Sequence, residues 1–229
     1  MGIEPVKHIF SINIGGFTLG IGYEILFQWA VIVVLGIASY LLTRNLSRNP
    51  NKKQVVLEMA YTSVENLVKN NMDESYLSYI PYVGTLMIYL LALNFSGLIG
   101  FSPVTKNISV TLGLGVSTFI VLNATALIRN GIGGFFKSFV KPYGFMLPIN
   151  ILERITLPIS LALRLFGNML AATILIDMIY EALGGVAWIA GIGTPIIAHG
   201  YFDLFDGAIQ MLAFTMLTII NIKLTAEHN

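Results

Sequence analysis

Five long apolar segments alternate with shorter polar stretches along the chain. They cover residues 23–43, 78–101, 108–128, 148–183 and 195–224. A transmembrane helix needs about 20 apolar residues to cross about 30 Å of hydrocarbon, so each segment is long enough to span a bilayer. The pattern therefore predicts an all-α integral membrane protein with about five membrane helices, in a single membrane domain over residues 1–229.

The last two segments are longer than a bilayer requires. At about 1.5 Å per residue, residues 148–183 would form a helix of about 54 Å and residues 195–224 one of about 45 Å. Helices of that length must tilt strongly or protrude from the membrane. The link GGVAWIAGIG, residues 184–193, holds four glycines and predicts that these two helices form a hairpin on the outer side.

Two shorter stretches carry their own patterns. In residues 51–72 apolar side chains recur at helical spacing, at Val55, Val56, Met59, Val64, Leu67 and Val68. This predicts an amphipathic helix, either lying on the cytoplasmic membrane surface or forming an ordinary loop helix. RNGIGG, residues 129–134, has the composition of a turn.

Basic residues are distributed unequally between the two sides of the predicted bundle. Nine follow the first, third and fifth segments, whereas only Lys7 and Lys106 lie on the other side. The nine are Arg44, Arg48, Lys52, Lys53, Lys69, Arg129, Lys137, Lys141 and Lys223. Because basic loops stay in the cytoplasm, we expect the N-terminus outside and the C-terminus inside.

Composition narrows the class further. The chain is 55% hydrophobic and 11% charged, whereas a soluble domain carries about 25% charged residues. The net charge of +1 gives no reason to expect nucleic acid as a partner. Cysteines are absent and the histidines, at positions 8, 199 and 228, are scattered, so we expect no resident metal or cofactor. Residues 1–22 lack a signal-peptide pattern, so we expect the first membrane helix to direct insertion.

One full positive charge lies deep in the fourth segment. Ser160, Arg164, Gly167, Asn168 and Ala171 fall on one helix face, which is small and polar around the arginine. No acid stands three or four residues from Arg164 on either side. A charge at mid-membrane costs about 2.5–3.5 kcal/mol on insertion scales, and the small face lets another helix come close to the arginine. Pro158 is expected to bend this helix just before the arginine.

A titratable stripe runs along the fifth segment. His199, Asp203, Asp206 and Gln210 share one face if the segment is α-helical throughout, and the residues beyond Gln210 are apolar. Counted from the hairpin, Gln210 should lie at a depth similar to that of Arg164. The stripe predicts a polar path that enters from outside and stops halfway, because intramembrane carboxylates usually mark ion paths.

Three further acids lie on the fourth segment. Asp177 and Glu181, near the outer end of the fourth segment, either join this path or are outer-edge residues. Glu153 is expected to form an interfacial ion pair with Arg154 at the inner end.

At these residues the sequence resembles a known family. LPISLALRLFGN, residues 157–168, closely resembles the signature of subunit a of bacterial F-type ATP synthases. GAIQMLAFTMLTIINI, residues 207–222, is similar to the last helix of that subunit. NFSGLIGFSP, residues 94–103, and GIGGFF, residues 131–136, stand where the family has similar loops.

The resemblance implies roles for particular residues. Arg164 would face a ring of c subunits whose carboxylates carry the ion, between two offset half-channels. Gln210 matches the glutamine of the last helix, and Asp203 takes a position where members carry histidine or an acid. Many members have an acid nine positions after the arginine, where this chain has Thr173. Asp177, one turn further on, is the candidate replacement.

The resemblance also implies partners and location. It implies a subunit that is not an enzyme by itself, bound to the c-ring, to the peripheral-stalk subunit b and to the remaining complex, in a bacterial plasma membrane. The carried ion is H⁺ or Na⁺, with a transient Na⁺ near Asp203 and Asp206 as one alternative. A self-contained channel or transporter and an assembly scaffold are rival interpretations. The first lacks inverted repeats, and the second gives no reason for the isolated arginine.

Overall fold

The structure, a computed structural model, describes residues 8–14, 17–99, 103–140, 143–183 and 197–227. Within them, five helical stretches are long and apolar enough to cross a membrane: Tyr23–Thr43, Glu74–Leu98, Ile108–Val140, Gly144–Ala182 and Ile197–Ala226. The prediction of a helical membrane protein with five spans, the last two long, is confirmed. The expected outer hairpin at residues 184–193, and the start of the last segment at Pro195, lie outside the described residues.

The chain begins with a hairpin that the apolar pattern did not predict. Strands β1 (His8–Ile14) and β2 (Phe17–Gly22) pair antiparallel, and β2 leads directly into α1 (Tyr23–Thr43). The next elements are α2 (Lys52–Asn71), the short 3-10 helix η1 (Glu74–Tyr79), α3 (Ile80–Asn94), and the 3-10 turns η2 (Phe95–Ile99) and η3 (Val104–Lys106). They are followed by α4 (Ile108–Val140), η4 (Gly144–Met146), α5 (Leu147–Leu183), the π-helix η5 (Gly200–Asp206) and α7 (Gly207–Glu227).

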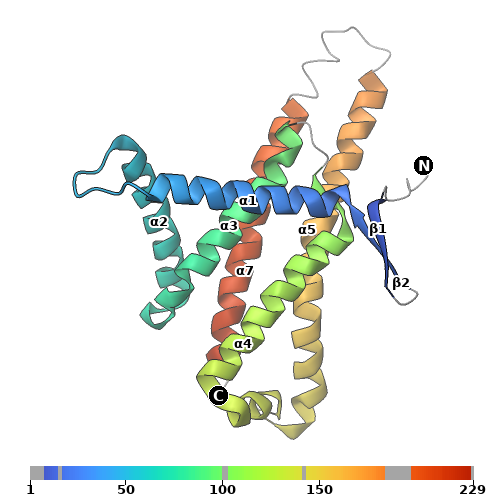
Figure 1. Cartoon of the computed structure of the whole chain (residues 1–229). Helices are drawn as coiled ribbons and strands as arrows, with labels where there is room; N and C mark the ends of the chain where they lie inside the picture. The colour runs from blue at the N-terminus through green and yellow to red at the C-terminus, as the bar shows by residue number, and fades with distance from the viewer. Residues whose placement is uncertain (1–7, 15–16, 100–102, 141–142, 184–196, 228–229) are drawn as a thin grey trace.

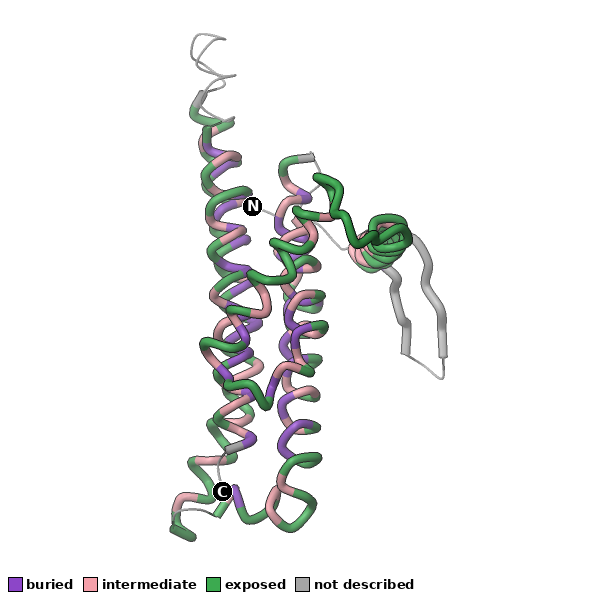
Figure 2. The backbone as a smooth tube through the Cα atoms, turned by 90° about the vertical axis from the view of Figure 1, so that its left-hand side faces the viewer, coloured by how far each residue is buried: buried purple, intermediate pink, exposed green. Residues whose placement is uncertain are grey.

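Helix α1 runs transversely to the other long helices. It crosses in front of α3 and α5 in Figure 1 and is seen end-on in Figure 2. Its 21 residues match the thickness of a bilayer, whereas the 37 residues of α5 would reach about 55 Å. α5 and α7 are strongly inclined to α1, and the tilt in the membrane that their length predicts stays a prediction.

The core lies between α3, α4, α5 and α7, and Figure 2 colours the buried positions along the long helices. One cluster joins Leu86 and Leu90 of α3 to Leu161 and Leu165 of α5 and Phe214 of α7. A second cluster joins α2, η1, α3, α4 and α7 through Val68, Met72, Tyr76, Ile80, Val83, Leu122, Ile219, Ile222 and Ala226. These side chains hold α7 against α3 and α4, and they hold the first half of α5 against the same bundle.

Helix α2 divides its apolar residues between two environments. Val68 is buried in the core and Val64 and Leu67 pack against it, whereas Val56 and Met59 remain mostly exposed. The second half of α2 therefore packs on the protein, and the first half keeps an exposed apolar face, as a surface helix would.

The turn predicted at RNGIGG is a kink inside a longer helix. Gly131 has φ 67° and ψ 174°, a conformation that favours glycine, and the chain then continues helically to Val140. The third predicted segment ended at residue 128, so the helix extends further than its apolar pattern.

The expected ion pair between Glu153 and Arg154 is not formed, because Arg154 turns toward the extension of α4. Its guanidinium donates to Asn123 Oδ1 at 3.2 Å and Ser138 Oγ at 2.9 Å, and lies 4.1 Å from the Phe139 ring centre. Arg154 therefore fixes the segment after the kink onto α5, and Glu153 points elsewhere.

Helices α4 and α5 approach each other closely at Gly115. A Cβ atom on Gly115 would lie 2.5 Å from the carbonyl oxygen of Pro158 and 3.3 Å from Cβ of Ala162. Pro158 lies inside α5, six residues before Arg164. The bare glycine therefore sets how near α4 can lie to the helix that carries the arginine.

We expect Gly115→Ala to destabilise the subunit by about 1–3 kcal/mol, the usual cost of forcing an extra methyl into a packed interface. The measurement is the temperature at which the chain is lost from the purified complex. Gly113→Ala is the matched control, since nothing lies within 4 Å of its Cβ position. Equal transition temperatures for the two variants would contradict the close approach.

Candidate functional site

Arg164 lies on an exposed face of α5 with the small and polar residues that the sequence placed around it. Ser160, Gly167, Asn168 and Ala171 are exposed with it, whereas Leu165 on the opposite face is buried. Among the described residues, none forms a hydrogen bond or ion pair with Arg164. The face can therefore accept another helix at close range, with the guanidinium free to bind a carboxylate.

Asn168 joins this face to α7. Its Nδ2 donates to Oε1 of Gln210 at 2.8 Å. Gln210 is buried, and its Nε2 atom has no hydrogen-bond partner in the part of the chain that the structure describes. Asn168 is one turn beyond Arg164 on α5, so its partner Gln210 of α7 lies close to the depth of Arg164. This is close to the depth expected from counting residues on either side of the predicted hairpin.

A second part of the site centres on Asp203 and His199. The Nδ1 atom of His199 lies 2.7 Å from Oδ2 of Asp203, and its Nε2 lies 3.4 Å from the hydroxyl of Tyr180 on α5. The Asp203 side chain is 4% exposed and that of His199 is 33% exposed. A carboxylate that accepts the Nδ1 proton leaves Nε2 of the neutral ring as an acceptor for Tyr180.

Sequence reasoning missed Tyr180. Its position on α5 showed no periodic signal that linked it to His199, 19 residues away. The link arises from the antiparallel course of α5 and the last helix, which also pairs Asn168 with Gln210.

The other acids of the predicted path are less enclosed. Asp206 is partly buried, and Asp177 and Glu181 are exposed; none of the three has a hydrogen-bond or ion-pair partner among the described residues. Thr173, at the position where the resemblance places an acid, donates to the Met169 carbonyl of its own helix at 2.9 Å. Residues 200–206 form the π-helix η5, so they do not advance by the α-helical steps that the predicted single face requires. His199 and Asp206 are partly buried, whereas Asp203 and Gln210 are buried.

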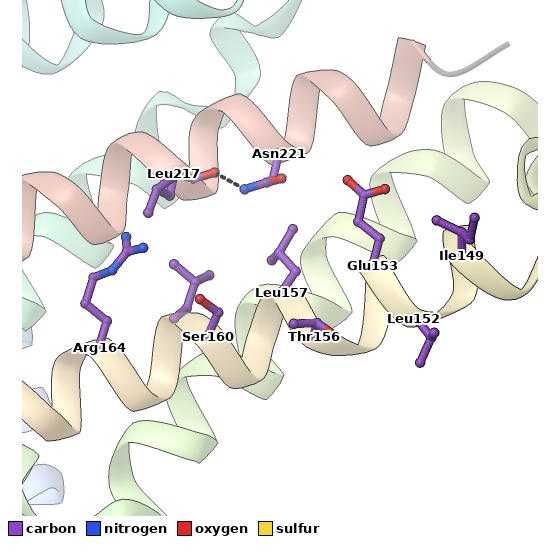
Figure 3. A pocket seen from close by; sticks show the side chains of 10 residues that line it. Ile149, Leu152, Glu153, Thr156, Leu157, Ser160, Arg164, Leu217 and Asn221 are labelled. Carbon is purple, nitrogen blue, oxygen red and sulfur yellow. Dashed lines mark hydrogen bonds between the residues drawn. The ribbon is translucent and has the colours of Figure 1, made fainter. Parts of the chain in front are cut away.

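A pocket of about 590 Å³ lies on the other side of Arg164, between α5 and α7. Figure 3 shows the side chains of Arg164 and Glu153 pointing from α5 into this space, opposite Leu217 and Asn221 of α7. Thr156 and Ser160 add hydroxyl groups to its wall. Glu153, which sequence reasoning placed in an interfacial ion pair, is therefore the acid of this pocket.

The two polar regions lie on opposite sides of the arginine along the same helix pair. One holds Tyr180, His199 and Asp203 beyond Asn168 along α5, and the other holds Glu153 and Asn221 before Arg164. Each offers groups that can exchange protons or coordinate a small cation with water. No cluster of three or more metal-ligating side chains occurs within the described ranges.

Comparison with known proteins shows the family of the chain. The family model described as "ATP synthase A chain" matches residues 25–223. The chain is 32% identical over 192 residues to ATP synthase subunit a of Moorella thermoacetica, covering 83% of this chain and 84% of that protein. It is 28% identical over 235 aligned positions to the sodium-ion-specific ATP synthase subunit a of Propionigenium modestum, covering 96% and 78%. The chain therefore belongs to the ATP synthase A chain family, the multi-pass membrane subunits that translocate H⁺ or Na⁺ in the stator of F-type ATP synthase.

Proposed function

We propose that Arg164 separates two half-channels in this subunit and is the residue that meets the carboxylates of the c-ring. The observation that carries the proposal is its place: an exposed guanidinium without a described partner, between an outer polar region and an inner polar pocket. The resemblance of residues 157–168 to the family signature supports the same role.

The outer half-channel would begin at the end of α5, at Asp177, Tyr180 and Glu181. It would pass the acids and the histidine of the last helix, His199, Asp203 and Asp206. It would end at Gln210 and Asn168. Its innermost contact is the hydrogen bond between Asn168 and Gln210, beside the arginine face. The inner half-channel would be the pocket with Glu153, Ser160 and Asn221, which opens on the other side of Arg164. An ion that crosses the membrane must change half-channels, and only the rotating ring could carry it between them.

The chemistry of the transfer follows from the fixed charge. A ring carboxylate that releases its ion into a half-channel becomes anionic and is attracted to Arg164 in a low-dielectric environment. Further rotation must separate the pair, so an attraction that was too strong would stop the ring. Arginine suits this role because it stays protonated where a buried lysine could lose its charge. Each ion supplies about 2.3 kcal/mol per 100 mV, so several are needed for each ATP.

The orientation that basic residues predict has structural support. Lys223 near the end of α7 forms an ion pair with Asp73 at 2.8 Å, and Arg129 of α4 donates to the Ser75 carbonyl at 2.6 Å. These contacts bring the end of α7, and the part of α4 just before the Gly131 kink, to the junction that follows α2. We propose that this end is cytoplasmic and that the N-terminus is outside, in a bacterial plasma membrane.

The exposed surfaces fit the expected partners. The Arg164 face would take the c-ring, and the exposed apolar surface of α1 would meet lipid and the membrane part of subunit b. The carried ion is H⁺ or Na⁺. Sodium, which the Propionigenium modestum relative uses by its name, would pass transiently near Asp203 and Asp206. Measuring ATP hydrolysis against sodium concentration at fixed pH distinguishes the two ions.

Arg164→Ala is expected to abolish ATP synthesis driven by an ion gradient, because the ring carboxylate loses its fixed counter-charge. The measurement is ATP synthesis in vesicles that hold the whole complex, together with passive ion leak through the membrane sector. Arg164→Lys is the control for charge without the guanidinium fork and should retain little activity. Normal synthesis in the alanine variant would refute the assignment.

Asp203→Asn and Asp206→Asn are each expected to slow ATP-driven ion pumping, because each removes a carboxylate from the outer half-channel. Assembly of the complex, checked by copurification with the c-ring and soluble subunits, should be unchanged. Asp203 should have the larger effect, since its carboxylate is buried and bonded to His199. Wild-type pumping rates in both variants would show that these acids are only structural.

Glu153→Gln is expected to slow ion exchange with the inner side while leaving the fold intact, because no described hydrogen bond or ion pair depends on Glu153. Pumping rates should fall, and the thermal stability of the complex should stay the same. A variant that loses stability but pumps normally once assembled would make Glu153 a structural residue.

A further inference from the structure

The π-helix η5 is an unusual element at the outer end of the last helix. Short π segments within α-helices are rare and are frequent at functional sites. η5 packs against η2, the turn that follows α3, and it carries Asp203 at its centre. The residues of η2 and α3 that touch it have no assigned role in the half-channels.

Asn94, the last residue of α3, holds the end of the π-helix. Its Nδ2 donates to the carbonyl of Gly207 at 3.0 Å, and its Oδ1 accepts from Thr105 Oγ1 at 3.4 Å. Asn94 and Thr105 are fully buried. A change from π to α hydrogen bonding disturbs the backbone ladder, so a side-chain donor at this carbonyl stabilises the junction inside the membrane.

Gly97 in η2 forms the floor beneath the carboxylate of Asp203. A Cβ atom on Gly97 would lie 2.6 Å from Oδ2 and 2.7 Å from Cγ of Asp203. The same Oδ2 atom is bonded to Nδ1 of His199 at 2.7 Å. The Asp203 carboxylate that bonds to His199 therefore occupies space that is open only because residue 97 has no side chain.

We propose that Gly97 is a positioning residue for Asp203, and this rests on the proposed role of Asp203 in the outer half-channel. A methyl group at position 97 displaces the carboxylate from its seat and breaks its bond to His199. The displaced group is the free end of a side chain, so the backbone of η2 and η5 can keep its course. Gly97 thus acts on ion passage through Asp203 and does not itself contact the ion.

Gly97→Ala tests the proposal in the assembled complex. ATP-driven ion pumping should fall roughly ten- to a hundredfold, the scale seen when a reacting group is misplaced by about an ångström. Gly84→Ala, in the preceding helix α3, is the control, since its Cβ would meet only Val64 Cγ1 at 3.8 Å. Equal pumping by the two variants, with Asp203→Asn still impaired, would overturn the positioning role and leave the half-channel in place.

A double variant separates positioning from a general packing effect. Asp203→Ser shortens the side chain over residue 97, so adding Gly97→Ala in that background should cause no further loss of pumping. If Gly97→Ala alone reduces assembly, the added Asp203→Ser should restore it. Independent, multiplicative losses or an assembly defect without rescue would overturn the proposal. Unimpaired pumping by both Asp203→Asn and Asp203→Ser would remove the half-channel role on which it rests.

Discussion

A guanidinium on an apolar helix, without an ion-pair partner among the described residues, is the constraint around which this subunit is organised. Such a charge is costly in hydrocarbon, and under the proposed function Arg164 has to stay accessible to a carboxylate of the c-ring. The small residues beside it keep one face of α5 open, and the long inclined course of α5 presents that face over many turns. α5 packs mainly on α4, so it meets α7 at few points and a pocket remains between them.

The other arginine of α5 shows that an open guanidinium is a property of the position. Arg154, ten residues earlier, is fully engaged by Asn123, Ser138 and two phenylalanine rings. It serves packing, since it attaches the segment after the Gly131 kink to α5. The hydrogen-bonding groups of Arg154 are therefore paired within the chain. The guanidinium of Arg164 has no partner among the described residues.

Much of this organisation was predictable because it is local. Segment length fixes the number of spans, and the spacing of Arg164, Gly167 and Asn168 fixes a face of α5. Contacts between distant segments were not predictable, since no periodic signal links Tyr180 to His199 or Gly97 to Asp203. The interpretation of Glu153 failed for the same reason: adjacent charges suggested an ion pair, but the α4 extension provided a better site for Arg154. The β-hairpin before α1 lies in a stretch where strand pairing, rather than apolar run length, decides the structure.

The π-helix has a consequence for how sequences of this kind should be aligned. Because η5 widens the helical turn, the residues on either side of it are related by a rotation that an α-helix would not give. Deleting one residue from this segment would turn everything before it by about 100° relative to Gln210 and the rest of α7. Two relatives whose segments differ in length by one residue can therefore have an acid at the same place in the structure although the two acids do not align in sequence. Equivalent residues around Asp203 are thus better identified by their neighbours in η2 and α5 than by the number of residues that separate them from Gln210.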